Sequence, residues 1–161
     1  MKTIALPNAL FIPEIKRAID EGHTTTFRVR GYSMRLFLED RRDKVVLAPC
    51  KEVKVGDVVL AEIQKDKYVL HRVIQKEGEH LTLMGDGNVY GTETCNTSNV
   101  IGIAIGFLRK GRDVMDTTDG KKWKICGALY ESVRVSYFIL EFFYVDKTFI
   151  DLLLSIRKKS R

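Results

Sequence analysis

The stretch TTTFRVRG, residues 24–31, indicates the fold class because its side chains alternate in character along the chain. After the threonines, Phe27 and Val29 alternate with Arg28 and Arg30, which is the two-residue period of a half-buried strand. Five further apolar runs bounded by turn-forming residues follow: KVVLAP (44–49), DVVLAEI (57–63), YVLHRVI (68–74), HLTLMG (80–85) and NVIGIAIGFL (99–108). Six short strands at this spacing predict a mainly β fold, either an antiparallel barrel-like domain or two sheets.

The sequence divides into an N-terminal helical segment, a β-rich domain and a C-terminal segment, at residues 1–23, 24–112 and 113–161. In the first of these, Pro13 is suited to the first turn of a short helix and Gly22 to its C-terminal cap. The apolar side chains of this helix share one stripe, at Ile15, Ala18 and Ile19. We expect this stripe to be buried.

The C-terminal segment becomes apolar and aromatic after about Lys121, and its length and composition predict one or two helices. Its most apolar part, residues 133–155, carries five charged side chains, so we expect no membrane-spanning helix. Two interpretations stay open. The segment packs on the β domain or in a dimer contact, or it lies peripherally on a membrane with its basic end facing anionic lipid.

The net charge of +6, from 27 Lys and Arg against 21 Asp and Glu, is concentrated at the end of the chain. Four basic residues follow residue 156, which leaves 23 basic and 21 acidic residues, or +2, for residues 1–156. The β region has no basic stripe with interleaved aromatics, so we expect no nucleic-acid partner.

Cysteines and histidines give no sign of a metal or a cofactor. Cys50, Cys95 and Cys126 are widely spaced without a C-x-x-C pair, which favours free thiols in a reducing compartment. No spacing typical of metal ligands joins them to the histidines. The N-terminus lacks the apolar core and cleavage site of a signal peptide. We therefore expect a cytoplasmic protein, or one peripheral at a membrane surface.

Three short motifs are candidates for chemistry. Ser33 follows Gly31 at the end of a strand, His71 is the one histidine within an apolar strand, and Asp86 lies in a G-D-G-N turn. A serine needs a base to act as a nucleophile, and a carboxylate can orient that base. Taken singly, each motif is better explained by a turn or by a hydrogen-bonded strand histidine.

Five motifs in order resemble the type I signal peptidase family, and its Ser/His branch in particular. They are G-Y-S-M (31–34), V-G-D-V-V (55–59), L-H-R-V (70–73), G-D-G-N (85–88) and V-I-G (100–102). The related self-cleaving repressors of the LexA type share the β fold and the serine but use a lysine base. The resemblance implies a serine endopeptidase that acts on a peptide or a precursor protein.

The resemblance also implies roles for individual residues. Ser33 would be the nucleophile, His71 the general base and Asp86 the acid, with Glu93 as the alternative acid. The backbone N–H of Ser33 would contribute to the oxyanion hole, and an extended peptide would bind by strand addition. The neighbouring residues assigned to substrate or oxyanion binding are Gly31, Tyr32 and Met34.

Two features depart from the family pattern. Leu36 occupies the position of a family proline, and only 32 residues precede Ser33, without an N-terminal membrane anchor. We therefore expect a soluble or peripheral variant, whose substrate and oligomeric state the sequence leaves open. Two other functions also stay open: a catalytically degenerate peptide-binding module, and a LexA-like self-cleaving regulator in which Lys67 would be the candidate base. The single N-terminal helix is too short for helix-turn-helix recognition, which disfavours the regulator.

Overall fold

A computed structural model describes residues 8–35, 38–88, 91–112 and 114–120. The elements in chain order are α1 (Asn8–Asp20), β1 (Thr25–Arg28), β2 (Lys44–Ala48), β3 (Val58–Gln64), β4 (Lys67–Glu77), β5 (His80–Met84), β6 (Thr92–Asn96), the 3₁₀ turn η1 (Thr97–Asn99), β7 (Val100–Leu108) and β8 (Asp116–Thr117). The predicted mainly β fold with a short N-terminal helix is confirmed.

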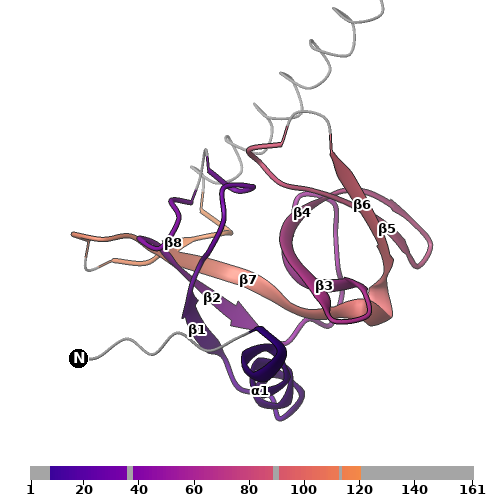
Figure 1. Ribbon diagram of the computed structural model, residues 1–161, viewed down its shortest axis with the longest axis horizontal. Coiled ribbons are helices and arrows are strands. Elements are labelled where there is room, and N and C mark those ends of the chain that lie inside the picture. The colour runs from indigo at the N-terminus through magenta and orange to yellow at the C-terminus, as the bar shows by residue number, and fades with distance from the viewer. Residues whose placement is uncertain (1–7, 36–37, 89–90, 113, 121–161) are drawn as a thin grey trace, which may run out of the picture. The chain divides into compact units, whose positions relative to one another are not determined.

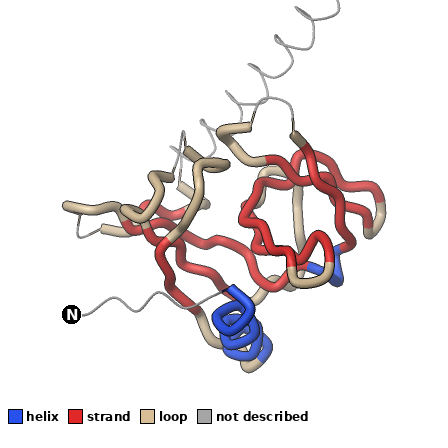
Figure 2. The backbone as a smooth tube through the Cα atoms, viewed as in Figure 1, coloured by secondary structure: helices blue, strands red, loops and turns tan. Residues whose placement is uncertain are grey.

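The eight described strands belong to one antiparallel sheet with the order β1-β2-β7-β3-β4-β5-β6, and β8 pairs with β7. The part of the sheet from β3 to β6 curls strongly, as Figures 1 and 2 show, but the sheet does not close. The sequence predicted a barrel-like domain or two sheets, and the structure has one open, coiled sheet.

Helix α1 begins five residues earlier than the sequence predicts, so that Pro13 lies inside it. Proline in a helix costs a backbone hydrogen bond, but the longer helix adds Ile12 to the buried stripe of Ile15 and Ile19. The predicted cap is confirmed. Gly22 has a φ of +88°, its N–H donates to the carbonyl oxygen of Ile19, and the next N–H donates to Ala18.

The sheet contributes to two apolar clusters. The first combines α1 with side chains of β2, β3 and β7, including Ile15, Leu47 and Phe107. The second lies within the curled part of the sheet and includes Val59 and Leu83. This second cluster packs the strands that hold the candidate histidine and its neighbours.

Two strands were not predicted. β6, with the sequence TETCN, has no apolar run, and its residues alternate between exposed and half-buried. It forms because every one of its residues pairs with β5, from His80↔Asn96 to Met84↔Thr92. β8 is only two residues long and pairs with Gly106 and Phe107 of β7. Short polar edge strands of this kind depend on a neighbouring strand instead of on their own pattern.

Some predictions fall outside the described residues. These are Leu36 in the proline position and the helices, dimer contact and lipid contact expected within residues 121–161. The domain boundaries after residues 23 and 112 stay predictions. Among the described helices, none has the length and apolarity that crossing a bilayer requires.

Candidate active site

Ser33 lies in a turn, five residues after the end of β1 at Arg28. Gly31 has a φ of +100°, which glycine adopts without strain, and its N–H donates to the Asp40 carboxylate at 2.8 Å. The N–H of Arg35 donates to the carbonyl oxygen of Tyr32 at 3.0 Å and closes the turn. These bonds hold the half-buried Ser33 at a defined place after the strand.

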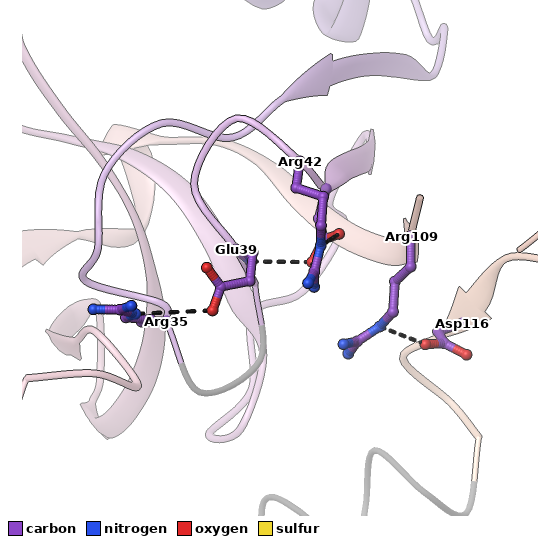
Figure 3. Close-up of polar contacts among 6 residues, drawn as sticks. Arg35, Glu39, Arg42, Arg109 and Asp116 are labelled. Atoms are coloured by element: carbon purple, nitrogen blue, oxygen red, sulfur yellow. Dashed lines mark hydrogen bonds and ion pairs between the residues drawn. The ribbon is translucent and has the colours of Figure 1, made fainter. Parts of the chain in front are cut away.

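A loop after the turn packs beside the strand end that leads to the serine. Val29 donates to the carbonyl oxygen of Asp43, and Arg41 donates to that of Val29, both at 3.0 Å. The buried Asp43 carboxylate accepts two bonds from Arg42, at 2.8 and 2.9 Å, and one from the Glu39 N–H at 3.0 Å (Figure 3). Burial acts to raise the pKa of Asp43, but these hydrogen bonds outweigh it, so the pKa lies below its ordinary 3.8.

The G-D-G-N loop lies directly against the backbone of the Ser33 turn. The Gly87 N–H donates to the carbonyl oxygen of Ser33 at 2.6 Å. A Cβ on Gly85 would lie 2.9 Å from the Ser33 Cβ and overlap its carbonyl oxygen, and one on Gly87 would lie 2.7 Å from the Tyr32 carbonyl oxygen. Both glycines are therefore required by the close approach of the two loops, which explains why the two motifs occur together.

Asp86 is part of a buried ion pair with Arg72. Both of its oxygens accept hydrogen bonds at 2.7 Å, from Nε and Nη2 of Arg72, and the two side chains are 0% and 4% exposed. The third nitrogen, Nη1, donates to the carbonyl oxygen of Gly56 at 2.7 Å. This pair therefore connects three of the sequence motifs: L-H-R-V, G-D-G-N and V-G-D-V-V.

Asp57, the acid of the V-G-D-V-V motif, stabilises the turn before β3 and pairs with β4. Its carboxylate accepts from the Lys54 N–H at 2.8 Å, and its carbonyl oxygen accepts from the Val73 N–H at 2.8 Å. Burial raises the pKa of Asp57, and the hydrogen bond from Lys54 opposes this only in part. These two hydrogen bonds give Asp57 a structural role in the V-G-D-V-V motif.

His71 is hydrogen-bonded to Glu93, the alternative acid of the sequence analysis. Its Nδ1 lies 2.8 Å from Oε2 of Glu93, and the side chains are 5% and 27% exposed. Because an ionised carboxylate can only accept, a neutral imidazole in this bond carries its proton on Nδ1 and has Nε2 as an acceptor. Of the two acids predicted, Glu93 contacts the histidine and Asp86 contacts Arg72.

Ser33 and His71 line the same cavity, which has a volume of about 620 Å³. Its apolar walls come from α1, β1, β3 and β4 and include Phe11, Ile12, Phe27, Leu60 and Leu70. The histidine is thus placed on the cavity by β4 and the serine by the turn after β1. A cavity of this size that combines apolar walls with polar side chains is typical of a site for a small ligand or several side chains of a peptide.

Two strand edges that pair with no other described strand border this cavity. β1 is the terminal strand of the sheet order, and residues 26–31 line the cavity. In β4, pairing with β5 begins only at Arg72, so in the described chain residues 67–71 pair with β3 alone. Free N–H and C=O groups on such edges can bind an extended peptide as an added strand.

The residues predicted around the oxyanion hole differ in their surroundings. The N–H of Gly31 is occupied by Asp40, as described above. Tyr32 is 64% exposed, and the guanidinium carbon of Arg35 lies 5.4 Å from its ring centroid. Met34 is only 4% exposed and packs in the core. Their predicted roles in binding stay predictions.

The N–H of Ser33 is the remaining candidate donor. Among the described residues, no acceptor is bonded to it. On the other side of the turn, the Met34 sulfur accepts from the Asp86 N–H at 3.3 Å. The turn is therefore held by its neighbours while this backbone donor stays available.

Sequence reasoning assigned no role to Arg72 or Asp40. The signal for Arg72 was present, because an arginine within an apolar strand run needs a buried partner. Asp40 had no comparable signal, since a loop carboxylate nine residues from Gly31 has no typical pattern.

A family model described as Peptidase S24-like matches residues 2–105, a span that contains Ser33, His71 and Glu93. No curated protein matches the chain.

Proposed function

The chain belongs to the Peptidase S24-like family, and on this premise we propose that it is a serine endopeptidase acting through an acyl-enzyme. The family supports a serine peptidase or LexA-like fold in general. The observation that carries the proposal is the His71–Glu93 hydrogen bond of 2.8 Å beside a cavity that Ser33 also lines. In this proposal Glu93, and not Asp86, orients the base.

In the first step, Ser33 Oγ attacks the carbonyl carbon of the scissile peptide bond. Nε2 of His71 takes the hydroxyl proton, since Nδ1 is engaged with Glu93. The Glu93 carboxylate stabilises the imidazolium that results. The backbone N–H of Ser33 donates to the oxyanion of the tetrahedral intermediate.

In the second step, the intermediate collapses and the peptide C–N bond breaks. The imidazolium of His71 gives its proton to the leaving amine, and the acyl group stays as an ester on Ser33. Water then attacks the ester, with His71 again as the base, and releases the acid product. No metal or cofactor takes part in these steps.

The substrate would bind as an extended strand along the edges of β1 and of the first half of β4. Support comes from the unpaired edges that border the cavity and from the apolar walls between them. This arrangement would bring a carbonyl group near the end of β1, where the Ser33 turn begins.

A finer assignment follows the five motifs. We place the protein with the Ser/His branch of type I signal peptidases, because the base on β4 is His71 in the L-H-R-V motif. Lys67, the base candidate for a LexA-like self-cleaving regulator, begins β4 as an exposed residue and is not among the residues that line the cavity. The chain thus offers a histidine in the place where that alternative needs a lysine.

N-terminal sequencing of cellular peptides tests this function and finds the substrate. Cells carrying the wild-type chain, Ser33→Ala or Ser98→Ala are compared. Ser98 is an exposed serine of η1 and serves as the matched control. We expect a precursor to accumulate with Ser33→Ala only. Identical peptides in all three strains would contradict the proposal, and cleavage of the chain itself alone would favour the self-cleaving regulator.

A further inference from the structure

Three arginines line the candidate active-site cavity: Arg28, Arg30 and Arg41. No aspartate or glutamate is among the described residues that line it. Arg28 and Arg30 are exposed, and no carboxylate of the described chain forms an ion pair with either. The cavity therefore combines an apolar wall with a positive charge that is not neutralised locally, although residues 1–156 as a whole carry only +2.

The nearest loop does not supply the missing negative charge, because its acids are already engaged. Glu39 lies 3.8 Å from Arg35 (Figure 3), and the buried Asp43 is bonded to Arg42. Asp40 accepts from the Gly31 N–H and lies 3.5 Å from Arg41. Arg41 is thus partly compensated, whereas Arg28 and Arg30 are not.

Arg28 is the last residue of β1, and Arg30 follows it two residues later. The Val29 N–H donates to the carbonyl oxygen of Asp43, which continues the pairing of β1 with β2 by one residue. Because side chains two residues apart in an extended chain point to the same face, we infer that Arg28 and Arg30 share one face while Phe27 and Val29 share the other. Phe27 is half-buried and Val29 is buried, whereas both arginines are exposed. In a peptide strand added to this edge, the side chains opposite the arginines would lie on the arginine face, and the side chains between them would lie on the apolar face.

We propose that the enzyme selects acidic peptides, with carboxylates at two positions two residues apart and an apolar residue between them. This inference rests on the proposed function and names its substrate class. The carboxylates pair with Arg28 and Arg30 while the apolar side chain enters the wall formed by Phe27 and Leu60. Because Arg30 precedes Ser33 by only three residues, the acidic positions lie within about five residues of the scissile bond, on one side of it.

A positional library of decapeptides tests this preference. Each position is Asp, Ala or Lys in turn in an otherwise neutral background, and the cleaved bond is located by mass spectrometry. We expect Asp at the two positions to raise kcat/KM by about 2- to 5-fold each, the range of exposed ion pairs. The gain should shrink as salt rises from 0.05 to 0.5 M, since screening weakens exposed pairs.

Charge reversal supplies the decisive comparison. The double variant Arg28→Glu/Arg30→Glu should prefer Lys at the same two positions, a gain that an unfolded protein cannot give. The control Lys51→Glu reverses an exposed charge that does not line this cavity and should keep the preference for Asp. Equal cleavage of Asp, Ala and Lys peptides by the wild type would overturn the acidic preference while leaving the peptidase intact. Cleavage of no peptide, together with no labelling of Ser33 by a fluorophosphonate, would overturn the proposed function as well.

Discussion

Replacing Asp86 by asparagine should destabilise the fold strongly, because it removes the carboxylate charge that faces the buried Arg72 guanidinium. The two side chains are 0% and 4% exposed and share two hydrogen bonds of 2.7 Å. Removing one partner of a buried ion pair costs about 3–5 kcal/mol. For a chain of this size that corresponds to a fall in Tm of about 6–20 °C.

Thermal unfolding followed by circular dichroism measures this effect. Asp20→Asn is the matched control, since Asp20 pairs with Lys16 at 2.9 Å but both side chains are about 60% exposed, and its Tm should not change measurably. The double variant Arg72→Met/Asp86→Leu should recover part of the loss, because no unpaired charge remains. A wild-type Tm for Asp86→Asn, combined with loss of peptidase activity, would refute this reasoning and assign Asp86 to the catalytic histidine.

Three further predictions concern other parts of the site. Gly85→Ala should lower both Tm and activity, because the added methyl group overlaps the turn that holds Ser33. The control Gly91→Ala should change neither, since its added methyl group would lie 3.8 Å from the nearest atom, on Asn88. Equal Tm values for the two variants would contradict the close approach of the two loops. Glu93→Gln should lower kcat by about 10²–10⁴-fold with little change in KM or Tm, and an unchanged kcat would remove Glu93 from the mechanism. Because the pKa of Asp43 is lowered in the folded state, its contribution to stability is present above pH 3.8 and is lost as the pH falls through the folded-state pKa. In urea unfolding, Asp43→Asn should therefore have a lower free energy of unfolding than the wild type at pH 6, and the two free energies should converge as the pH falls to 2. A difference in unfolding free energy that stays constant with pH would contradict this.

The strands were predictable wherever apolar side chains alternate or run together. All six predicted runs correspond to strands, from TTTFRVRG at β1 to NVIGIAIGFL at β7. β6 was not predictable because its side chains are polar and it forms by pairing with β5, a contact that no local pattern encodes. The start of α1 was placed too late because Pro13 is typical of a first turn, while packing of Ile12 extends the helix past it.

In the candidate site, the residues in short motifs could be predicted from sequence, but the contacts between distant motifs could not. The motifs single out Ser33 and His71, and both residues line one cavity; their catalytic roles stay predictions. The choice between Asp86 and Glu93 could not be made from sequence, because it depends on which acid the curled sheet brings to His71. Motif order favoured Asp86, but the buried arginine next to the histidine pairs with that carboxylate.

Active-site labelling tests whether Ser33 is a nucleophile that His71 activates. The folded wild-type chain is treated with a fluorophosphonate, and the modified residue is mapped by mass spectrometry alongside Ser33→Ala, His71→Ala and the control Ser98→Ala. We expect one modification, on Ser33. Ser98→Ala should retain it, Ser33→Ala should abolish it, and His71→Ala should slow it markedly, since Ser33 needs its base. A folded wild-type chain that does not react, or one that reacts equally after loss of Ser33, would contradict it.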